Sequence, residues 1–225
     1  MVWRWGLFLY MAAMTVAAFL SAPLARKLHE QTRIIYCHIP VAWVTVVAFV
    51  VAGFHSYRYL KTRDLASDAR AAAAAELGLL FCGLATVSGS IFSKGMWGAY
   101  WNWDPRQTSI FFLLLVYAAY LTLRAAVEEP ARRARLAAVY GLFAAAVTPL
   151  LVFVVPRLFF TLHPDPIVNA GGRLEMHPRM FQVFLASLVG FTALFFWVYA
   201  LDVRLRLHRL RIDGAWSGAG TDRAP

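Results

Sequence analysis

The sequence predicts an all-α, polytopic membrane protein with six transmembrane helices and an amphipathic, tryptophan-rich segment on the outer side. The first observation is composition: the 225 residues are 60% hydrophobic, and the mean hydropathy is +0.58. A soluble domain of this length would not carry so much apolar surface. The second is that apolar runs of about 20 residues, the length of a membrane-spanning helix, recur along the chain. No soluble domain, repeat or low-complexity linker separates them, so we expect one domain over residues 1–225.

The predicted spans cover residues 5–24, 38–60, 71–93, 106–126, 136–155 and 180–201. The first has a short basic start and small residues at Ser21-Ala22, which also resemble a signal peptide. The distribution of loop charge favours its retention as a helix. The second carries Pro40 in its first turn, where the missing N–H does no harm. The third has Glu76 near its start.

The distribution of Lys and Arg in the loops predicts the orientation of the spans, because cytoplasmic loops are enriched in these residues. Eight fall on one side, and that side should face outward: Arg26, Lys27, Arg33, Lys94, Arg106, Arg157, Arg173 and Arg179. The other fourteen fall on the side that includes Arg4 and the basic residues after 201. We therefore expect both termini in the cytoplasm and the stretch between the third and fourth spans outside.

Composition excludes several functional classes. The net charge of +10 fits basic loops against anionic lipid headgroups rather than nucleic acid. Cys37 and Cys82 stand alone, without a CxxC or CxxCH pattern, so the chain is neither a dithiol oxidoreductase nor itself a c-type cytochrome. Walker A, GxGxxG and HExxH patterns do not occur in the sequence. No nucleophile–base pair is visible either, and we do not expect an enzyme.

The densest aromatic cluster lies within residues 94–109, where four rings fall in seven residues: Trp97, Tyr100, Trp101 and Trp103. On a helix, positions 97, 100, 101 and 104 would share one face, with Asp104 as its acidic edge. Gly95 and Gly98 weaken a helix here. We therefore expect the stretch to lie along the membrane surface, with Pro105 starting the fourth helix and Asp104 near its N-terminus. The rings could form an interfacial belt or a flat platform for a planar apolar ligand.

Four of the six histidines fall on the predicted outer side: His29, His38, His163 and His177. His38 opens the second span and His163 follows the fifth. Two histidines at helix ends, at the depth of an aromatic platform, suggest axial ligands of a haem iron. Haem propionates would need cations, and Arg106, Arg157 and Arg179 are candidates. Zinc is the competing ligand, although no HxH, CxxC or HxxxH spacing supports it.

The run Trp97-Gly98-Ala99-Tyr100-Trp101-Asn102-Trp103-Asp104 resembles the tryptophan-rich motif of haem-handling membrane proteins. With the flanking outer histidines, six spans and this length, the chain is similar to the haem exporter protein C family of cytochrome c maturation. The resemblance implies that His38 and His163 are the axial ligands of a transported haem b. It also implies a site that binds haem and engages a partner, made of Trp97, Gly98, Tyr100, Trp101, Trp103 and Asp104, with Arg106 beside it.

The resemblance further implies a place in the bacterial cytoplasmic membrane and transfer of haem to a periplasmic haem chaperone. It implies partners as well: the ATPase and permease subunits of an ABC transporter and a small one-helix subunit. Tyr100 stands where the commonest motif has Trp, and His177 falls where many members have Asp. His163 is nevertheless the better second ligand, because Thr-Leu-His directly after the fifth span matches the family.

Three alternative functions deserve comparison. A permease subunit of an ABC-type haem or solute exporter would need polar residues or broken helices at mid-membrane, and the span centres here are apolar. A quinol-linked cytochrome b would place histidine pairs inside its helices. A system II cytochrome c synthase, suggested by Pro105 and the residues after it, has more helices than this chain can supply.

Overall fold

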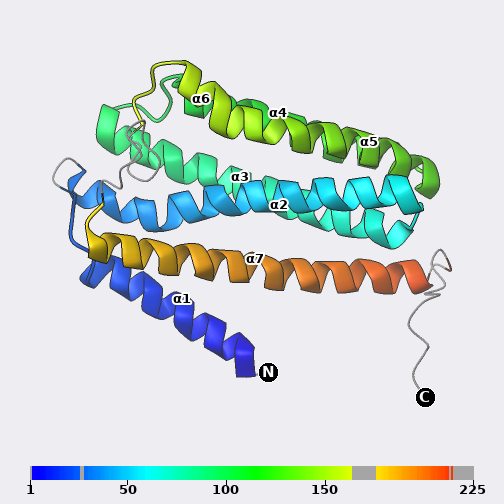
Figure 1. The fold of residues 1–225 in the computed structure, drawn as a ribbon, viewed down its shortest axis with the longest axis horizontal. Coiled ribbons are helices and arrows are strands. Elements are labelled where there is room, and N and C mark those ends of the chain that lie inside the picture. Colours follow the sequence, from blue (N-terminus) through cyan, green and yellow to red (C-terminus); the bar gives the residue numbers. More distant parts are fainter. Residues whose placement is uncertain (1, 26–27, 164–175, 213, 215–225) are drawn as a thin grey trace.

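The computed structural model describes residues 2–25, 28–163, 176–212 and 214, and throughout these residues the regular secondary structure is helical (Figure 1). Within these described ranges, six helical runs are long and apolar enough to cross a membrane, which confirms the predicted fold class. The elements are α1 Val2–Leu20, the 3₁₀ turn η1 His29–Ile34, α2 Ile35–Thr62, α3 Leu65–Trp97, α4 Pro105–Ala126, α5 Pro130–Pro149, the π-helical η2 Leu150–Val154, α6 Val155–Leu158 and α7 Pro178–Ile212.

Several helices extend beyond the spans predicted for them. The third predicted span covers residues 71–93 and the sixth residues 180–201, whereas α3 runs over Leu65–Trp97 and α7 over Pro178–Ile212. The fifth predicted span, residues 136–155, corresponds to α5 followed by η2 and α6. Together these form one apolar helical run over Pro130–Leu158. Hydropathy detects only the apolar part of a helix. The charged turns at its ends are also helical, although they are too polar to be detected in this way. The membrane boundaries themselves stay a prediction.

Acidic residues start three of the long helices. The carboxylates of Asp64, Asp104 and Glu129 accept hydrogen bonds from backbone N–H groups in the first turns of α3, α4 and α5. Such caps satisfy donors that have no partner within the helix. Proline follows at the first helical position in α4 and α5. The expectation that Pro105 starts the fourth helix with Asp104 at its N-terminus is therefore confirmed.

Small residues allow the central helices to pack closely. Residues 71–75 of α3 are five consecutive alanines, and all five are buried. A Cβ added at Gly53 of α2 would overlap the Cβ of Ala145 on α5, so the backbone of Gly53 packs directly against the methyl group of Ala145. Without a hydrophobic force between helices in lipid, close packing of small residues is a main source of association. These contacts hold α2 at the centre of the bundle.

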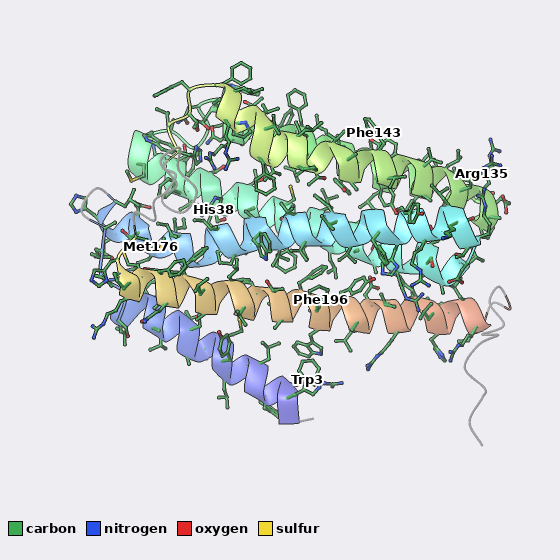
Figure 2. The ribbon with its side chains drawn as sticks, in the orientation of Figure 1. Trp3, His38, Arg135, Phe143, Met176 and Phe196 are labelled. Atoms are coloured by element: carbon green, nitrogen blue, oxygen red, sulfur yellow. The ribbon has the colours of Figure 1, made fainter. Side chains whose placement is uncertain are left out.

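The connections between the helices lie at two opposite ends of the bundle. In Figure 1, the connections from α1 to α2 and from α3 to α4 lie at one end, together with α6 and the start of α7. The α2–α3 and α4–α5 turns lie at the opposite end, with the last turns of α7. His38 and Arg135, which we predicted on opposite sides of the membrane, lie toward these opposite ends in Figure 2. The end that holds His38 is called the histidine end below.

The tryptophan-rich stretch is a loop rather than a helix. Of residues 97–104, only Trp97 is helical, as the last residue of α3. Residues 98–104 form the connection to α4. Gly98 ends α3 in the left-handed conformation, with φ of 79°, a region that glycine enters without steric cost. The helical face imagined for positions 97, 100, 101 and 104 therefore does not form, because the glycine breaks it after its first member.

Candidate functional site

A cavity of about 210 Å³ lies at the histidine end, between α2, α3, α4 and the η2–α6 segment. Its polar lining includes His38, Arg106, Gln107 and His163, and the aromatic rings of Phe92 and Trp101 form part of its wall. The remaining lining is mostly aliphatic, with Ile34, Ile39 and Leu151 among its members. Two histidines that are far apart in sequence thus share one largely apolar cavity with an arginine, a combination suited to a planar apolar ligand with acidic substituents.

A hydrogen bond with Ser88 of α3 orients the His38 ring. The Nδ1 atom of His38 lies 2.9 Å from the Ser88 hydroxyl oxygen. That hydroxyl lies 2.8 Å from the carbonyl oxygen of Leu84, to which it donates its single proton. The Ser88 oxygen is therefore the acceptor and His38 Nδ1–H the donor. In this tautomer the lone pair sits on Nε2, the nitrogen with which a neutral imidazole binds a metal.

Gly89 makes room for the His38 ring. A Cβ added at Gly89 would lie 2.9 Å from His38 Cε1, closer than real carbon atoms approach. We therefore expect Gly89→Ala to push the ring away from Ser88 and to lower haem affinity about tenfold or more, the size of loss typical when the support behind a metal-binding histidine is disturbed. The measurement is a haem titration followed by absorption. Gly83→Ala is the matched control, because a Cβ there meets nothing within 4 Å; equal affinities of the two variants would contradict the expectation.

His163 is held by Asp104. Its Nδ1 lies 3.0 Å from Asp104 Oδ1, and the Asp104 side chain is 1% exposed. The same carboxylate accepts the backbone N–H of Leu162 at 2.7 Å and the Thr161 hydroxyl at 2.9 Å. It also caps α4 through the N–H of Arg106 at 2.9 Å. One side chain thus joins the tryptophan-rich loop, the start of α4 and the segment that carries His163.

The protonation of Asp104 follows from these contacts. Burial raises the pKa of this carboxyl, but the N–H groups of Leu162 and Arg106, and further the nearby His163 and Thr161, lower it by more, so the net pKa is below the usual value. Asp104 is therefore ionised at neutral pH and accepts from His163 Nδ1–H. The lone pair of His163 then lies on Nε2, as it does in His38.

The aromatic residues divide into two groups. Trp97 packs against His163 with ring centroids 5.1 Å apart, and Trp101 lines the cavity. Tyr100 and Trp103 are 61% and 67% exposed and do not line it. Trp101 and Trp103 meet edge to face at 89°. The rings therefore do not form the single flat platform that we considered from the sequence.

Polar contacts that the sequence analysis missed fix the loop. Gln107 accepts the N–H of Asn102 at 2.9 Å and donates to the carbonyl of Tyr100. The Ser93 hydroxyl contacts the carbonyl oxygen of Ala99 at 2.7 Å. Gln107 lies three residues after the end of the aromatic motif at Asp104, and this proximity could have marked it. Ser88, Gly89 and Phe92 carried no such signal, because small and aromatic residues are common in apolar helices.

The structure also separates the remaining candidates. Of the three arginines considered for propionates, only Arg106 lines the cavity, whereas Arg157 donates to the carbonyl of Phe153. Arg179 and His177 are exposed and lie outside the lining. The Nδ1 atom of His177 accepts the backbone N–H of Arg179, 3.2 Å away, at the start of α7. This placement favours His163 over His177 as the partner of His38.

Fold and site together define a class: a six-helix membrane protein with a two-histidine cavity next to a tryptophan-rich loop. The sequence model of the family described as "Heme exporter protein C" matches residues 1–218. The heme exporter protein C of Bradyrhizobium diazoefficiens is 34% identical over 180 residues, which are 80% of this chain and 68% of that relative. The chain belongs to the heme exporter protein C family.

Two further relatives support this membership. The heme exporter protein C of Paracoccus denitrificans is 30% identical over 210 residues, covering 89% of this chain and 85% of the relative. A putative cytochrome c biosynthesis ccmC-like mitochondrial protein of Arabidopsis thaliana is 27% identical over 201 residues, covering 89% and 75%. The similarity therefore extends over most of the chain, and the residues that the family model matches include the whole cavity.

Proposed function

We propose that this protein takes part in cytochrome c maturation by binding haem in the cavity at the histidine end and delivering it to a periplasmic haem chaperone. The observation that carries the proposal is that His38 and His163, from distant parts of the chain, line one cavity. Each has its Nδ1 within 3.0 Å of an acceptor from another segment. Family membership and the names of the relatives supply the process. Haem b is the cargo that two neutral imidazoles would bind without a covalent bond.

The residues of the cavity fit such a cargo. Haem brings an iron that accepts two axial nitrogens, and the Nε2 atoms of His38 and His163 would supply them. The guanidinium of Arg106 is suited to a propionate, because it presents paired donors and stays charged. Trp101, Phe92 and the aliphatic lining would cover apolar porphyrin and exclude water. None of these roles requires a catalytic nucleophile, and we propose a haem-handling protein rather than an enzyme.

The exposed rings of Tyr100 and Trp103 are suited to the chaperone rather than to the haem. Large aromatic side chains on a surface are frequent anchors of protein interfaces, where their loss costs about 2 kcal/mol or more. We expect Tyr100→Ala and Trp103→Ala to slow haem transfer to the purified chaperone by about tenfold or more, with an unchanged spectrum of the bound haem. Tyr57→Ala, at a 53% exposed ring of α2, is the matched control. A changed haem spectrum with normal transfer would contradict this division of roles.

The same proposal includes an orientation. The excess of Lys and Arg on one side supports an orientation with both termini in the cytoplasm. The family resemblance supports a place in the bacterial cytoplasmic membrane. Reporter fusions after Leu60 and Ala126 should then read cytoplasmic, and fusions near Gly98 and Gly171 periplasmic. A periplasmic signal after Leu60 would overturn the topology. As further partners we propose ABC transporter subunits and a one-helix subunit, on the basis of the family resemblance.

A further inference from the structure

The Nδ1 atoms of the two histidines in the cavity have different hydrogen-bond partners. His163 donates to the carboxylate of Asp104, which is buried and also accepts the Leu162 N–H and the Thr161 hydroxyl. His38 donates to a neutral hydroxyl, that of Ser88, whose own proton points to the carbonyl of Leu84. The chain therefore offers one charged and one neutral acceptor to otherwise similar imidazoles.

The charge of the acceptor changes the donor strength of the ring. An imidazole whose Nδ1–H is bonded to a carboxylate gains electron density on Nε2 and becomes a more basic metal ligand. A charge-assisted hydrogen bond is also about twice as strong as a neutral one, so it fixes the ring more firmly. The Ser88 oxygen supplies orientation to His38 but no negative charge.

The surroundings of the two rings increase this difference. Asp104 also binds the backbone N–H of Leu162 and the Thr161 hydroxyl, so the segment around His163 is fixed to the same carboxylate as its ring. Trp97 and Phe92 pack beside that ring, with centroids 5.1 and 6.5 Å away. The His38 ring has Gly89 against its Cε1 face and Ser88 as its partner. The acceptors that hold its ring are neutral: the Ser88 hydroxyl and the backbone carbonyl of Ala85.

We infer that the two histidines are unequal ligands: Asp104 makes His163 the strong, permanent ligand, and Ser88 leaves His38 the weaker one, which a competing ligand displaces. The inference rests on the proposed function and adds which ligand is released first. Asp104 and Ser88 are positioning residues, because they act through the histidines. The exchange is a ligand substitution: the bond to His38 Nε2 breaks, one to the incoming ligand forms, and no electron is transferred.

The test uses carbon monoxide on the purified, haem-loaded, dithionite-reduced protein. Carbon monoxide takes one axial position, and its vibrational frequencies report the ligand that remains on the opposite side. We expect the adduct of the wild type to match that of His38→Ala and to differ from that of His163→Ala. A wild-type adduct that matches His163→Ala would overturn the inference.

The positioning residues are tested with variants that keep the shape of the site. We expect Asp104→Asn, which keeps an acceptor but removes the charge, to weaken haem binding about 10–100-fold and to shift the adduct toward retention of His38. Ser88→Ala should increase displacement of His38, and Ser88→Thr, which restores the hydroxyl, should reverse this. If Asp104→Asn leaves the adduct unchanged, the carboxylate is not the source of the difference and the inference fails.

Failure of the inference can be told from failure of the proposed function. If His38→Ala and His163→Ala both leave the spectrum of the bound haem unchanged, haem is not bound in this cavity and the proposed function fails. If both change the spectrum but carbon monoxide leaves His38 bound in the wild type, haem binds as proposed and only the ranking of the two ligands is wrong. The comparison of the wild type with the two histidine variants needs neither Asp104→Asn nor Ser88→Ala to fold.

Discussion

His163→Ala should lower the affinity for haem by at least about 100-fold. Loss of only the hydrogen-bond partner that orients a metal-binding histidine already lowers metal affinity about 10–100-fold. The variant removes both the Nε2 donor and the imidazole that Asp104 orients at 3.0 Å. His38→Ala should also lower the affinity, but by less, because His38 is the weaker of the two ligands. In each variant the iron should change from low spin to a species with an open position, and added imidazole should restore the low-spin spectrum.

His177→Ala is the control for both variants. His177 is exposed and contacts the N–H of Arg179 rather than the cavity. Its replacement should leave haem affinity and spectrum unchanged. A normal low-spin spectrum in His163→Ala, together with its loss in His177→Ala, would make His177 the second ligand and contradict the arrangement proposed for the cavity.

Arg124→Met should be the most destabilising single change that we expect outside the cavity. Arg124 of α4 binds Asp68 of α3 through two bonds of 2.6 and 2.9 Å. The two side chains are only 14% and 10% exposed. Removal of one partner leaves an uncompensated buried charge, which costs about 3–5 kcal/mol. The quantity to measure is the free energy of unfolding in a mixed detergent titration.

The double variant Asp68→Asn/Arg124→Met distinguishes the cost of an uncompensated buried charge from the cost of lost side-chain packing. Because both charges are removed, it should regain a large part of the stability lost in Arg124→Met. Arg132→Met, at an exposed position in the first turn of α5, is the matched control and should change stability little. An equal loss in the single and the double variant would show that the uncompensated charge is not the cause.

The helices of this fold could be predicted from hydropathy alone, but their ends could not. Apolar runs identified six spans because only a helix satisfies its backbone within lipid. The first turns of α3 and the last turns of α7 carry Asp68 and several arginines, and they extend each helix past its apolar part. The start of α4 was predictable, because Asp104-Pro105 combines an N-cap with a first-turn proline.

The candidate site could be predicted only in part. The histidines and the aromatic motif stand out in the sequence, but nothing local pairs Asp104 with His163, since the segments meet only after α4, α5 and α6 have packed. Ser88 and Gly89 were missed for a related reason: their importance comes from the approach of the His38 ring across a helix interface. Tyr100 and Trp103 could not be separated from Trp97 and Trp101 until the loop conformation was known.

The position of the iron in a structure of the haem-loaded protein tests the central claim most directly. The account predicts iron between His38 and His163, about 2 Å from each Nε2 atom, the usual length of a bond from histidine to a metal. It also predicts Arg106 near a propionate, and Tyr100 and Trp103 without contact to the porphyrin. Iron bound by His177, or at a place that includes neither His38 nor His163, would contradict the account.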